Sequence, residues 1–473
     1  SQEAYDFIQT AYSISEQFDT PVLFRITTRV AHSKSVVEVD EEKFRHVRSK
    51  RFHHDVEKYV MLPTNARVRV PNMHRRMIEL EEYSETTPLN QVVDGNNNTG
   101  IISSGVGYSY AREVYPDATF FKLGMTYPLP AKTLKQFADK VKKIFVVEEL
   151  DPFLEENIKV LGIHVEGKKH LPRFGELNTP IVHHAAVQAG TICHVNKPVE
   201  INPLKNLPGR PPLLCPGCPH AGAFFVLSTI GQRSKILDAS GKSEKESKLI
   251  ITGDIGCYTL ATYAPLRAID TTACMGASIG QAIGLEKAGV SSDVIAVIGD
   301  STFMHSGITG LIDAVYNDSK ITIVILDNGT TAMTGHQDHP GSGVSAQGCN
   351  TTKVDIENIV RGSGVTDLQV VNSFDIKSVR SAIRSALDNK ALSVVLVRGQ
   401  CAVANKKKKN QRQIDTDKCN DCGVCLMIGC PAIQRKDGKL NIDVATCMGD
   451  ECAVCEQLCP KKAISPITEK VNS

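Results

Sequence analysis

The placement of the cysteines constrains this chain more than any other feature of its sequence. Of the 15 cysteines in 473 residues, eight fall between Cys419 and Cys459, and the other seven are scattered. Disulfide frameworks are typical of small secreted chains, whereas dense cysteines in a long chain favour metal ligation in a reducing compartment. The sequence therefore predicts a metal-binding C-terminal segment in a cytoplasmic protein.

The eight cysteines form two runs, each ending in Cys-Pro: Cys419-x2-Cys422-x2-Cys425-x4-Cys430-Pro and Cys447-x4-Cys452-x2-Cys455-x3-Cys459-Pro. Both resemble the bacterial ferredoxin run, in which three close thiolates hold one 4Fe-4S cluster and the fourth reaches the other cluster. The first run has one extra residue before its last cysteine, and the second has two extra residues after its first. Structural zinc sites are the alternative, but the Cys-Pro pairs favour ferredoxin clusters.

This rule assigns the eight thiols to two clusters. The first tail set is Cys419, Cys422, Cys425 and Cys459. The second tail set is Cys430, Cys447, Cys452 and Cys455.

Length and charge limit the remaining possibilities. A chain of 473 residues is long enough for two to four domains. Its net charge of +2 gives no electrostatic case for binding nucleic acid or an anionic membrane. No apolar run approaches the roughly 20 residues that span a bilayer. The chain begins at Ser1 inside a helical pattern, so we expect it to be a piece of a longer polypeptide.

The hydrophobic pattern predicts an α/β fold with a parallel-sheet domain, followed by a two-cluster ferredoxin-like α+β module. Continuous apolar runs at 248–255, 293–300, 320–328 and 392–399 predict a buried parallel sheet. The expected parts are the end of an α/β domain with one helix and a strand at 20–28 (1–37), a solvated connector (38–95), a small α/β domain (96–195), a Pro-rich linker (196–211), the large sheet domain (212–405), a second linker (406–414) and the cysteine-rich tail (415–466).

Two strand ends of the large domain carry polar residues that suit a diphosphate. Gly299 and Asp300 end one predicted strand, and Asn328 ends the next. Asp and Asn oxygens can hold a Mg²⁺ that binds a diphosphate, and a helix starting after Gly299 would aim N–H groups at phosphate. A simple turn is the alternative for Gly-Asp alone.

This pattern resembles the diphosphate motif of thiamine-diphosphate enzymes. The resemblance implies Mg²⁺ ligation by Asp300, Asn328 and the carbonyl of Thr330, with Ser301 where the family usually has Gly. It also implies that the small residues Gly276 and Ser278 allow close approach to the thiazolium side of the cofactor.

Thiamine chemistry joined to a ferredoxin tail resembles the 2-oxoacid:ferredoxin oxidoreductases. The stretches "LCPGCPH", "GDIGCYTLA", "CMGASIG" and "TTAMTGHQ" are most similar to the large subunits of the indolepyruvate:ferredoxin oxidoreductase family, and the similarity runs from 27 to 459. It implies that 1–37 is the remnant of a pyrimidine-binding domain and that 96–195 is transketolase C-terminal-like. The activating Glu of the family would lie outside this chain.

The resemblance further implies a third 4Fe-4S cluster near thiamine, held by a catalytic-edge set of thiols: Cys215, Cys218, Cys257 and Cys401. Independently, Cys257 and Cys401 follow two predicted parallel strands, whose carboxyl ends lie on one side of the sheet. A structural zinc or a free redox couple are alternatives for the Cys215–Cys218 pair. The other cysteines, Cys193, Cys274 and Cys349, are expected to be buried apolar side chains.

The reaction implied by this resemblance is oxidative decarboxylation of an aryl pyruvate to the aryl-acetyl-CoA, with electrons passed to ferredoxin. His220 and His336 are candidate contacts near the reacting centre. A smaller beta subunit in a dimer of heterodimers is expected. The Lys run at 406–409 could steer an acidic ferredoxin, but it favours a solvated linker. The alternatives are a non-oxidative thiamine-dependent decarboxylase and an electron-transfer subunit without thiamine.

Overall fold

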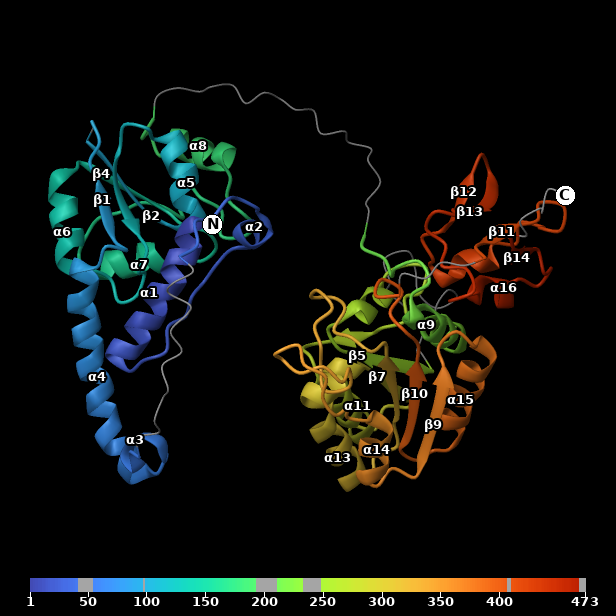
Figure 1. Ribbon diagram of the computed structural model, residues 1–473. Coiled ribbons are helices and arrows are strands. Elements are labelled where there is room, and N and C mark those ends of the chain that lie inside the picture. The colour runs from blue at the N-terminus through green and yellow to red at the C-terminus, as the bar shows by residue number, and fades with distance from the viewer. Residues whose placement is uncertain (41–53, 97, 193–210, 233–247, 406–409, 468–473) are drawn as a thin grey trace. The chain divides into compact units, whose positions relative to one another are not determined.

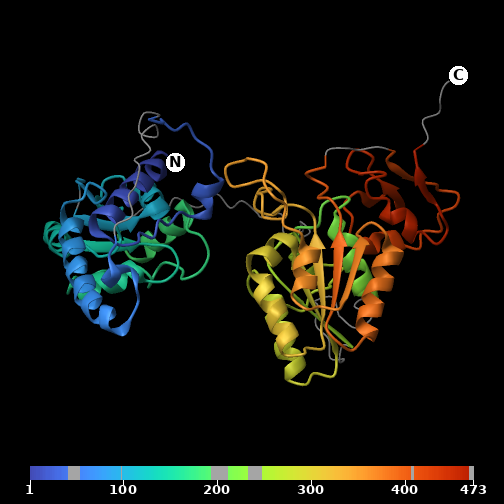
Figure 2. The same cartoon turned by 60° about the horizontal axis from the view of Figure 1, so that its bottom comes forward.

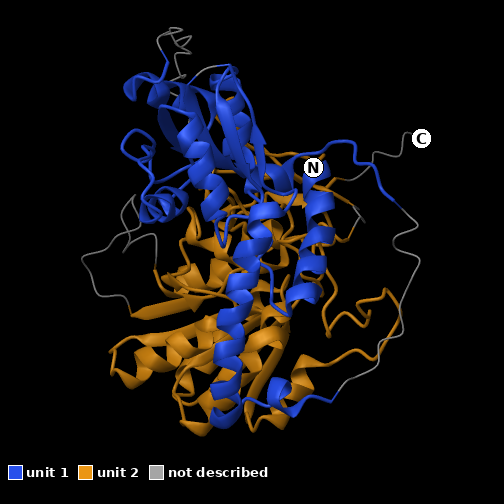
Figure 3. Cartoon of the chain, turned by 90° about the vertical axis from the view of Figure 1, so that its left-hand side faces the viewer, with its two compact units in different colours: residues 1–205 blue, residues 206–473 orange. Residues whose placement is uncertain are grey.

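The computed structural model describes residues 1–40, 54–96, 98–192, 211–232, 248–405 and 410–467. The chain divides into two compact units, Ser1–Lys205 and Asn206–Ser473, which Figure 3 distinguishes by colour. Within the described ranges, no helix is long and apolar enough to cross a membrane. Cys193, the Lys run at 406–409 and most of the linker at 196–211 lie outside the described residues.

The first unit is built on a four-stranded sheet of order β1-β3-β2-β4, in which only β1 is antiparallel (Figure 1). Buried aromatic and aliphatic side chains such as Phe120, Phe121 and Phe145 fill both faces. Its elements are α1 (Gln2–Phe18), α2 (Thr28–His32), α3 (Val56–Tyr59), α4 (Pro63–Thr86), β1 (Gln91–Val93), β2 (Thr99–Ser104), α5 (Gly105–Val114), β3 (Thr119–Leu123), α6 (Ala131–Lys140), β4 (Lys143–Val147), α7 (Phe153–Val160) and α8 (Thr179–Gln188).

The N-terminal 95 residues differ from the sequence-based expectation. The expected helix is present as α1, but residues 20–28 form no strand, because no described strand pairs with them and Leu23 is 93% exposed. The segment 38–95, which we expected to be a solvated connector, contains the long helix α4 and strand β1. Leu80 of α4 packs against Ile14 and Phe18 of α1. This part of the chain therefore has a small core of its own.

The second unit contains a six-stranded, all-parallel sheet of order β6-β5-β7-β8-β10-β9. Helices cover both of its faces, as Figure 2 shows. Its elements are α9 (Pro219–Ile230), β5 (Leu249–Gly253), η2 (Cys257–Thr262), β6 (Thr271–Thr272), α11 (Ala277–Lys287), β7 (Asp293–Gly299), α12 (Asp300–Thr302), η3 (Phe303–Gly307), α13 (Ile308–Tyr316), β8 (Thr322–Asp327), α14 (Ile356–Gly362), β9 (Asp367–Asn372), α15 (Ile376–Asp388) and β10 (Ser393–Arg398).

Alternate side chains of the central strands point to two separate cores. Val297, Val324 and Val395 pack toward α9 and α15. Their neighbours along the strands, Ile298 and Ile323, pack toward α11, α13 and α14. Burial on both faces explains the continuous apolar runs, so the four strands predicted from sequence are present and the predicted parallel sheet is confirmed.

The cysteine-rich tail combines two short antiparallel pairs, β11 with β14 and β12 with β13, and two short helical segments. Its core residues Ile428, Ile433 and Val454 belong to the same hydrophobic cluster as α9 and α15. Gln457 fixes this contact, because its side chain accepts from the N–H of Ile376 (3.2 Å) and donates to the carbonyl of Phe374 (2.7 Å). The tail elements are β11 (Arg412–Ile414), η4 (Val424–Ile428), β12 (Ile433–Lys436), β13 (Lys439–Ile442), α16 (Val454–Leu458) and β14 (Ile464–Pro466).

Candidate functional site

Asp300 ties the carboxyl ends of β7 and β8 together. One oxygen of its carboxylate accepts from the N–H of Ser301 (2.7 Å), and the other accepts from the N–H groups of Gly329 (2.7 Å) and Asn328 (3.1 Å). The side-chain oxygen of Asn328 in turn accepts from the N–H of Thr330 (3.0 Å). The structure thus brings together the three residues predicted to hold Mg²⁺, together with Ser301, whose hydroxyl accepts from Thr331 (2.7 Å).

His339 also lies close to this carboxylate and was not found from the sequence. Its Nε2 is 3.3 Å from Oδ2 of Asp300, while its Nδ1 accepts from the N–H of Gly341 (3.1 Å). Burial would raise the pKa of Asp300, but His339 and the N–H groups of Ser301 and Gly329 outweigh burial and hold it below its ordinary value. Asp300 is therefore ionised at neutral pH, as a Mg²⁺ ligand must be.

His220 reaches this centre from the beginning of α9. Its Nε2 lies 3.2 Å from the side-chain nitrogen of Asn328, and its ring meets Tyr258 edge to face with centroids 6.0 Å apart. Burial lowers the pKa of His220 to about 4, although the charge of Asp300 opposes this shift. His220 is therefore neutral at pH 7, and it can exchange hydrogen bonds without carrying charge.

The small residues expected near thiazolium have structural partners in this fold. Ser278 is fully buried, and both its N–H (2.6 Å) and its hydroxyl (2.9 Å) donate to the carboxylate of Asp254. Gly276 caps α11 with φ of +92°, and a side chain there would collide with the hydroxyl of Ser306. Asp254, a second residue that sequence reasoning missed, therefore organises the start of α11.

The four thiols of the catalytic-edge set are electrostatic neighbours. Burial raises the pKa of Cys218, and Cys215, Cys257 and Cys401 raise it further. Burial likewise raises the pKa of Cys215, and Cys401 raises it further. The pKa of Cys257 is raised by burial, then by Cys215 and then by Cys401. His336, the second predicted histidine, places its Nε2 at 3.8 Å from the sulfur of Cys401. Segments 186 residues apart along the chain thus converge at one edge of the sheet.

Each tail set also forms one group of neighbouring thiols. Burial raises the pKa of Cys425, and the thiols of Cys419, Cys422 and Cys459, the three other members of the first tail set, raise it further. The same four cysteines line one small cavity.

In the second tail set, burial and then the neighbouring thiols of Cys430 and Cys447 raise the pKa of Cys452 to about 11. The pKa of Cys455 is raised by burial and then by the three other members of that set. Cys452 and Cys455 therefore hold their protons at neutral pH, and metal binding would release them.

Backbone N–H groups point at several of these sulfurs. Cys447 accepts from Arg412 and Gly449, each at 3.4 Å, and Cys459 accepts from Ala463 at 3.2 Å. Such bonds stabilise thiolates that carry an iron–sulfur cluster. Over the described residues, no three His, Cys, Asp or Glu side chains are gathered tightly enough to hold one metal ion.

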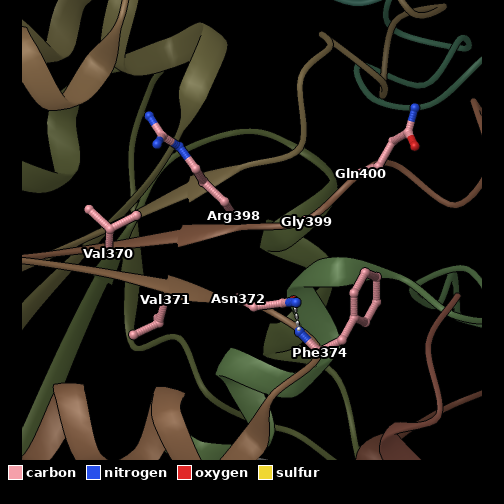
Figure 4. Close-up of a pocket in the computed structure, with 7 residues that line it drawn as sticks. All are labelled: Val370, Val371, Asn372, Phe374, Arg398, Gly399 and Gln400. Carbon is pink, nitrogen blue, oxygen red and sulfur yellow. Dashed lines mark hydrogen bonds between the residues drawn. The ribbon is translucent and has the colours of Figure 1, made fainter.

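An open hollow of about 530 Å³ lies at the carboxyl edge of the six-stranded sheet, at the ends of β9 and β10 (Figure 4). Val370, Val371 and Phe374 give it an apolar lining, and Asn372 accepts from the N–H of Phe374 (2.9 Å). Its charged side chain, Arg398, already pairs with Asp327 (3.1 Å), Asp355 (3.5 Å) and Glu357 (3.7 Å). The hollow contains none of the predicted site residues.

Two cysteines lie differently from the prediction. Cys274 and Cys349 were expected to be buried, but both are exposed. Each lies in a loop, Cys274 after β6 and Cys349 in the segment before α14, where no sheet or helix covers it. All cysteines in the described ranges are free thiols.

Comparisons with known proteins agree with this architecture. Residues 254–397 match the family described as thiamine pyrophosphate enzyme, C-terminal TPP binding domain. The chain is 36% identical to the indolepyruvate oxidoreductase subunit IorA of Archaeoglobus fulgidus, and the match covers 98% of this chain and 75% of that protein. It is 35% identical to the subunit of the same name from Methanothermobacter thermautotrophicus, with the same coverage. The chain spans about three quarters of the length of these relatives.

Among solved structures, 2-oxoglutarate:ferredoxin oxidoreductase from Magnetococcus marinus aligns with a TM-score of 0.35 and 19% identity. That alignment covers 43% of this chain and 67% of the other.

Proposed function

The chain belongs to the family of indolepyruvate oxidoreductase IorA subunits, and from this premise we propose that it binds thiamine diphosphate and oxidatively decarboxylates aryl pyruvates. The observation that carries the proposal is that the predicted magnesium ligands and the catalytic-edge thiols lie at the same edge of the large sheet. There, an ionised Asp300 and its partner Asn328 lie at the strand ends, and four thiols from distant segments are electrostatic neighbours at the same edge.

The Mg²⁺ and diphosphate would be held by Asp300, Asn328 and the carbonyl of Thr330. The ionised carboxylate and the hydrogen bond between Asn328 and Thr330 support this assignment. Gly299 and Ser301 would lie beside the diphosphate at the start of α12. Thiamine diphosphate, when bound, supplies the electron sink that lets a 2-oxoacid lose carbon dioxide.

We assign 4Fe-4S clusters to all three thiol sets. The grouping of each tail set, the cavity lined by the first tail set and the N–H groups directed at Cys447 and Cys459 support the assignment. A bacterial-type ferredoxin module then occupies 415–466. Free thiols throughout the described ranges agree with a reducing, cytoplasmic setting.

The overall reaction balances with ferredoxin as a one-electron acceptor. One aryl pyruvate, one coenzyme A and two oxidised ferredoxins give one aryl-acetyl-CoA, one carbon dioxide, two reduced ferredoxins and a proton. His220 is neutral and buried against Asn328, so its role would be to orient groups at the magnesium site. His336 would lie at the catalytic-edge cluster, beside Cys401. A smaller beta subunit would complete the enzyme as a dimer of heterodimers.

Because the activating Glu would lie outside this chain, the test is a ferredoxin or viologen reduction assay with the longer polypeptide that contains the chain, together with its smaller subunit. Adding indolepyruvate and coenzyme A should reduce the dye, whereas 2-oxoglutarate should not. Release of aldehyde without dye reduction would favour a non-oxidative decarboxylase. Purified protein without thiamine diphosphate would favour an electron-transfer subunit.

Iron analysis tests the cluster assignment. We expect about 12 iron atoms per chain, four for each thiol set. A value of about 8 iron atoms per chain would mean that the catalytic-edge cluster is absent.

A further inference from the structure

The loop between Cys215 and Cys218 touches the second tail set at Gly217. This glycine has φ of +68°, and a side-chain carbon built on it would lie 2.5 Å from Cγ and 2.8 Å from Cβ of Met448. The next nearest atom would be Cβ of Cys452, at 3.6 Å. Contacts below 3.0 Å are essentially never found, so only a residue without a side chain fits between these two thiol sets.

Gly217 lies between Cys215 and Cys218 of the catalytic-edge set. A side chain at this position would meet Met448 and then Cys452 of the tail. A single residue joins two thiol sets that are separated by more than 200 positions in the sequence.

The surrounding packing keeps this contact in place. Leu214 and Cys218 share a hydrophobic cluster with Cys447 and Val454 of the tail. Gln457 adds two hydrogen bonds to the residues around the start of α15. The junction is therefore part of one packed core.

The two tail sets differ in their access to solvent. Each set has one buried and at least two partly covered thiols, but the fourth thiol of the first set, Cys422, is exposed, whereas no thiol of the second set is. The second set thus meets the catalytic edge, and the first set opens to the outside.

We propose that Gly217 is a positioning residue that couples the catalytic-edge set to the second tail set, so that electrons enter the tail at the second set and leave it at the first. The proposal rests on the proposed function. Two electrons leave each 2-oxoacid and ferredoxin accepts one at a time, so the junction passes two single electrons per turnover. No bond is made or broken there.

The test replaces Gly217 by Ala in the full chain and measures iron content and the magnetic interaction between reduced clusters by electron paramagnetic resonance. The control is Gly438→Ala, which has the same strained backbone (φ of +78°) in the same module but no atom within 4 Å of the added carbon. Both variants should keep about 12 iron atoms.

In Gly217→Ala the added methyl must push the two sets apart, because it would lie 2.5 Å from Cγ of Met448. We therefore expect loss of the magnetic interaction between the second-set cluster and the catalytic-edge cluster. Gly438→Ala should leave this interaction unchanged.

Two outcomes would contradict the proposed role of Gly217. One is a Gly217→Ala protein with full iron and the magnetic coupling of the wild type. The other is a variant that loses iron and is not restored by the second change Met448→Gly, which removes both atoms that the methyl meets. A wild-type chain with about 8 iron atoms would instead mean that the catalytic-edge cluster of the proposed function is absent. The proposed role of Gly217 would then be wrong as well.

Discussion

The two sheets of this chain end in similar polar residues but use them differently. In the four-stranded sheet, the hydroxyl of Ser103 donates to the carbonyl of Val147 (2.6 Å) at the end of β4. Glu148, the next residue, accepts from the N–H groups of Leu154 (2.7 Å) and Glu155 (3.0 Å) and so caps α7. These buried polar groups thus have hydrogen-bond partners in nearby backbone groups, and they stabilise the fold.

In the six-stranded sheet, Asp300 accepts from a neighbouring strand end 28 residues away and faces His339 from a distant loop. Asp254, on the same edge, behaves like Glu148, because its carboxylate caps α11 through Ser278. An acid after a parallel strand is therefore not by itself a site. What distinguishes Asp300 is convergence with Asn328 and with thiols from remote segments.

The largest effect that this comparison predicts is for Asp300→Ala. Loss of a direct ligand should weaken binding of thiamine diphosphate with Mg²⁺ at least about 100-fold, since even supporting residues of metal sites contribute 10–100-fold. Calorimetric titration of the purified protein measures it, with the exposed Asp388→Asn as the control. Unchanged affinity would mean that the two sheet edges do not differ in the way described.

The next effect concerns the thiols. Cys401→Ala should lower the iron content from about 12 to about 8 atoms per chain, because one of three clusters loses a ligand. Cys349→Ala, which removes an exposed thiol outside the three sets, should keep all the iron. Full iron retention in the Cys401 variant would remove this residue from the ligand set.

A smaller effect is expected at the four-stranded sheet. Glu148→Ala should lower the free energy of unfolding by about 1 kcal/mol, the usual contribution of a helix cap. Iron and thiamine diphosphate should remain at wild-type amounts. Urea unfolding measures the change, and Glu156→Ala, an exposed acid in the same helical turn, is the control. Loss of cofactor in the Glu148 variant would show that this edge also serves a site.

The smallest effect is expected at Asp19, which ends α1. The side chain of Lys58 lowers the pKa of Asp19 below 3.8, against the opposing effect of burial, and Arg69 and Arg76 lower it further. Because the pKa is lower in the folded state, the stabilisation is present above about pH 4 and is lost as the pH falls through the lowered value.

Asp19→Asn should therefore slightly lower the melting temperature at pH 7 and should have no effect near pH 2, while Glu79→Gln should be neutral at both. An equal loss for Asp19→Asn at both pH values would exclude the ion pairs as the cause.

Sequence patterns predicted the large sheet because its strands are buried on both faces, which leaves long apolar runs such as that of β7. They also predicted the pairing of Asp300 with Asn328, because parallel strands end on one side. Strand β9 was missed, since it is an edge strand of mostly half-covered residues. Helix α4 was missed for a similar reason: of its 24 residues only Leu80 and Ser84 are buried, so its apolar periodicity is weak.

At the site, His339 and Asp254 were missed because their roles depend on tertiary contacts. His339 lies in an irregular loop without periodicity, and the only local signal is its spacing of three from His336 in "GHQDH". Asp254 stands in "GDIGCY", where Cys257 is the more conspicuous residue. A strand-end Asp followed by a Gly-rich helix start could have indicated its capping role.

The hydrogen bonds of Gln457 and the core shared by the tail with α9 and α15 have a consequence for transport. Many redox enzymes carry electrons on a domain that swings between donor and acceptor. Here the tail packs against the same sheet domain that holds the catalytic edge, so a large movement of the tail would break these contacts. Under the proposed function, the part that moves would be a separate ferredoxin, which would dock at the face around Cys422.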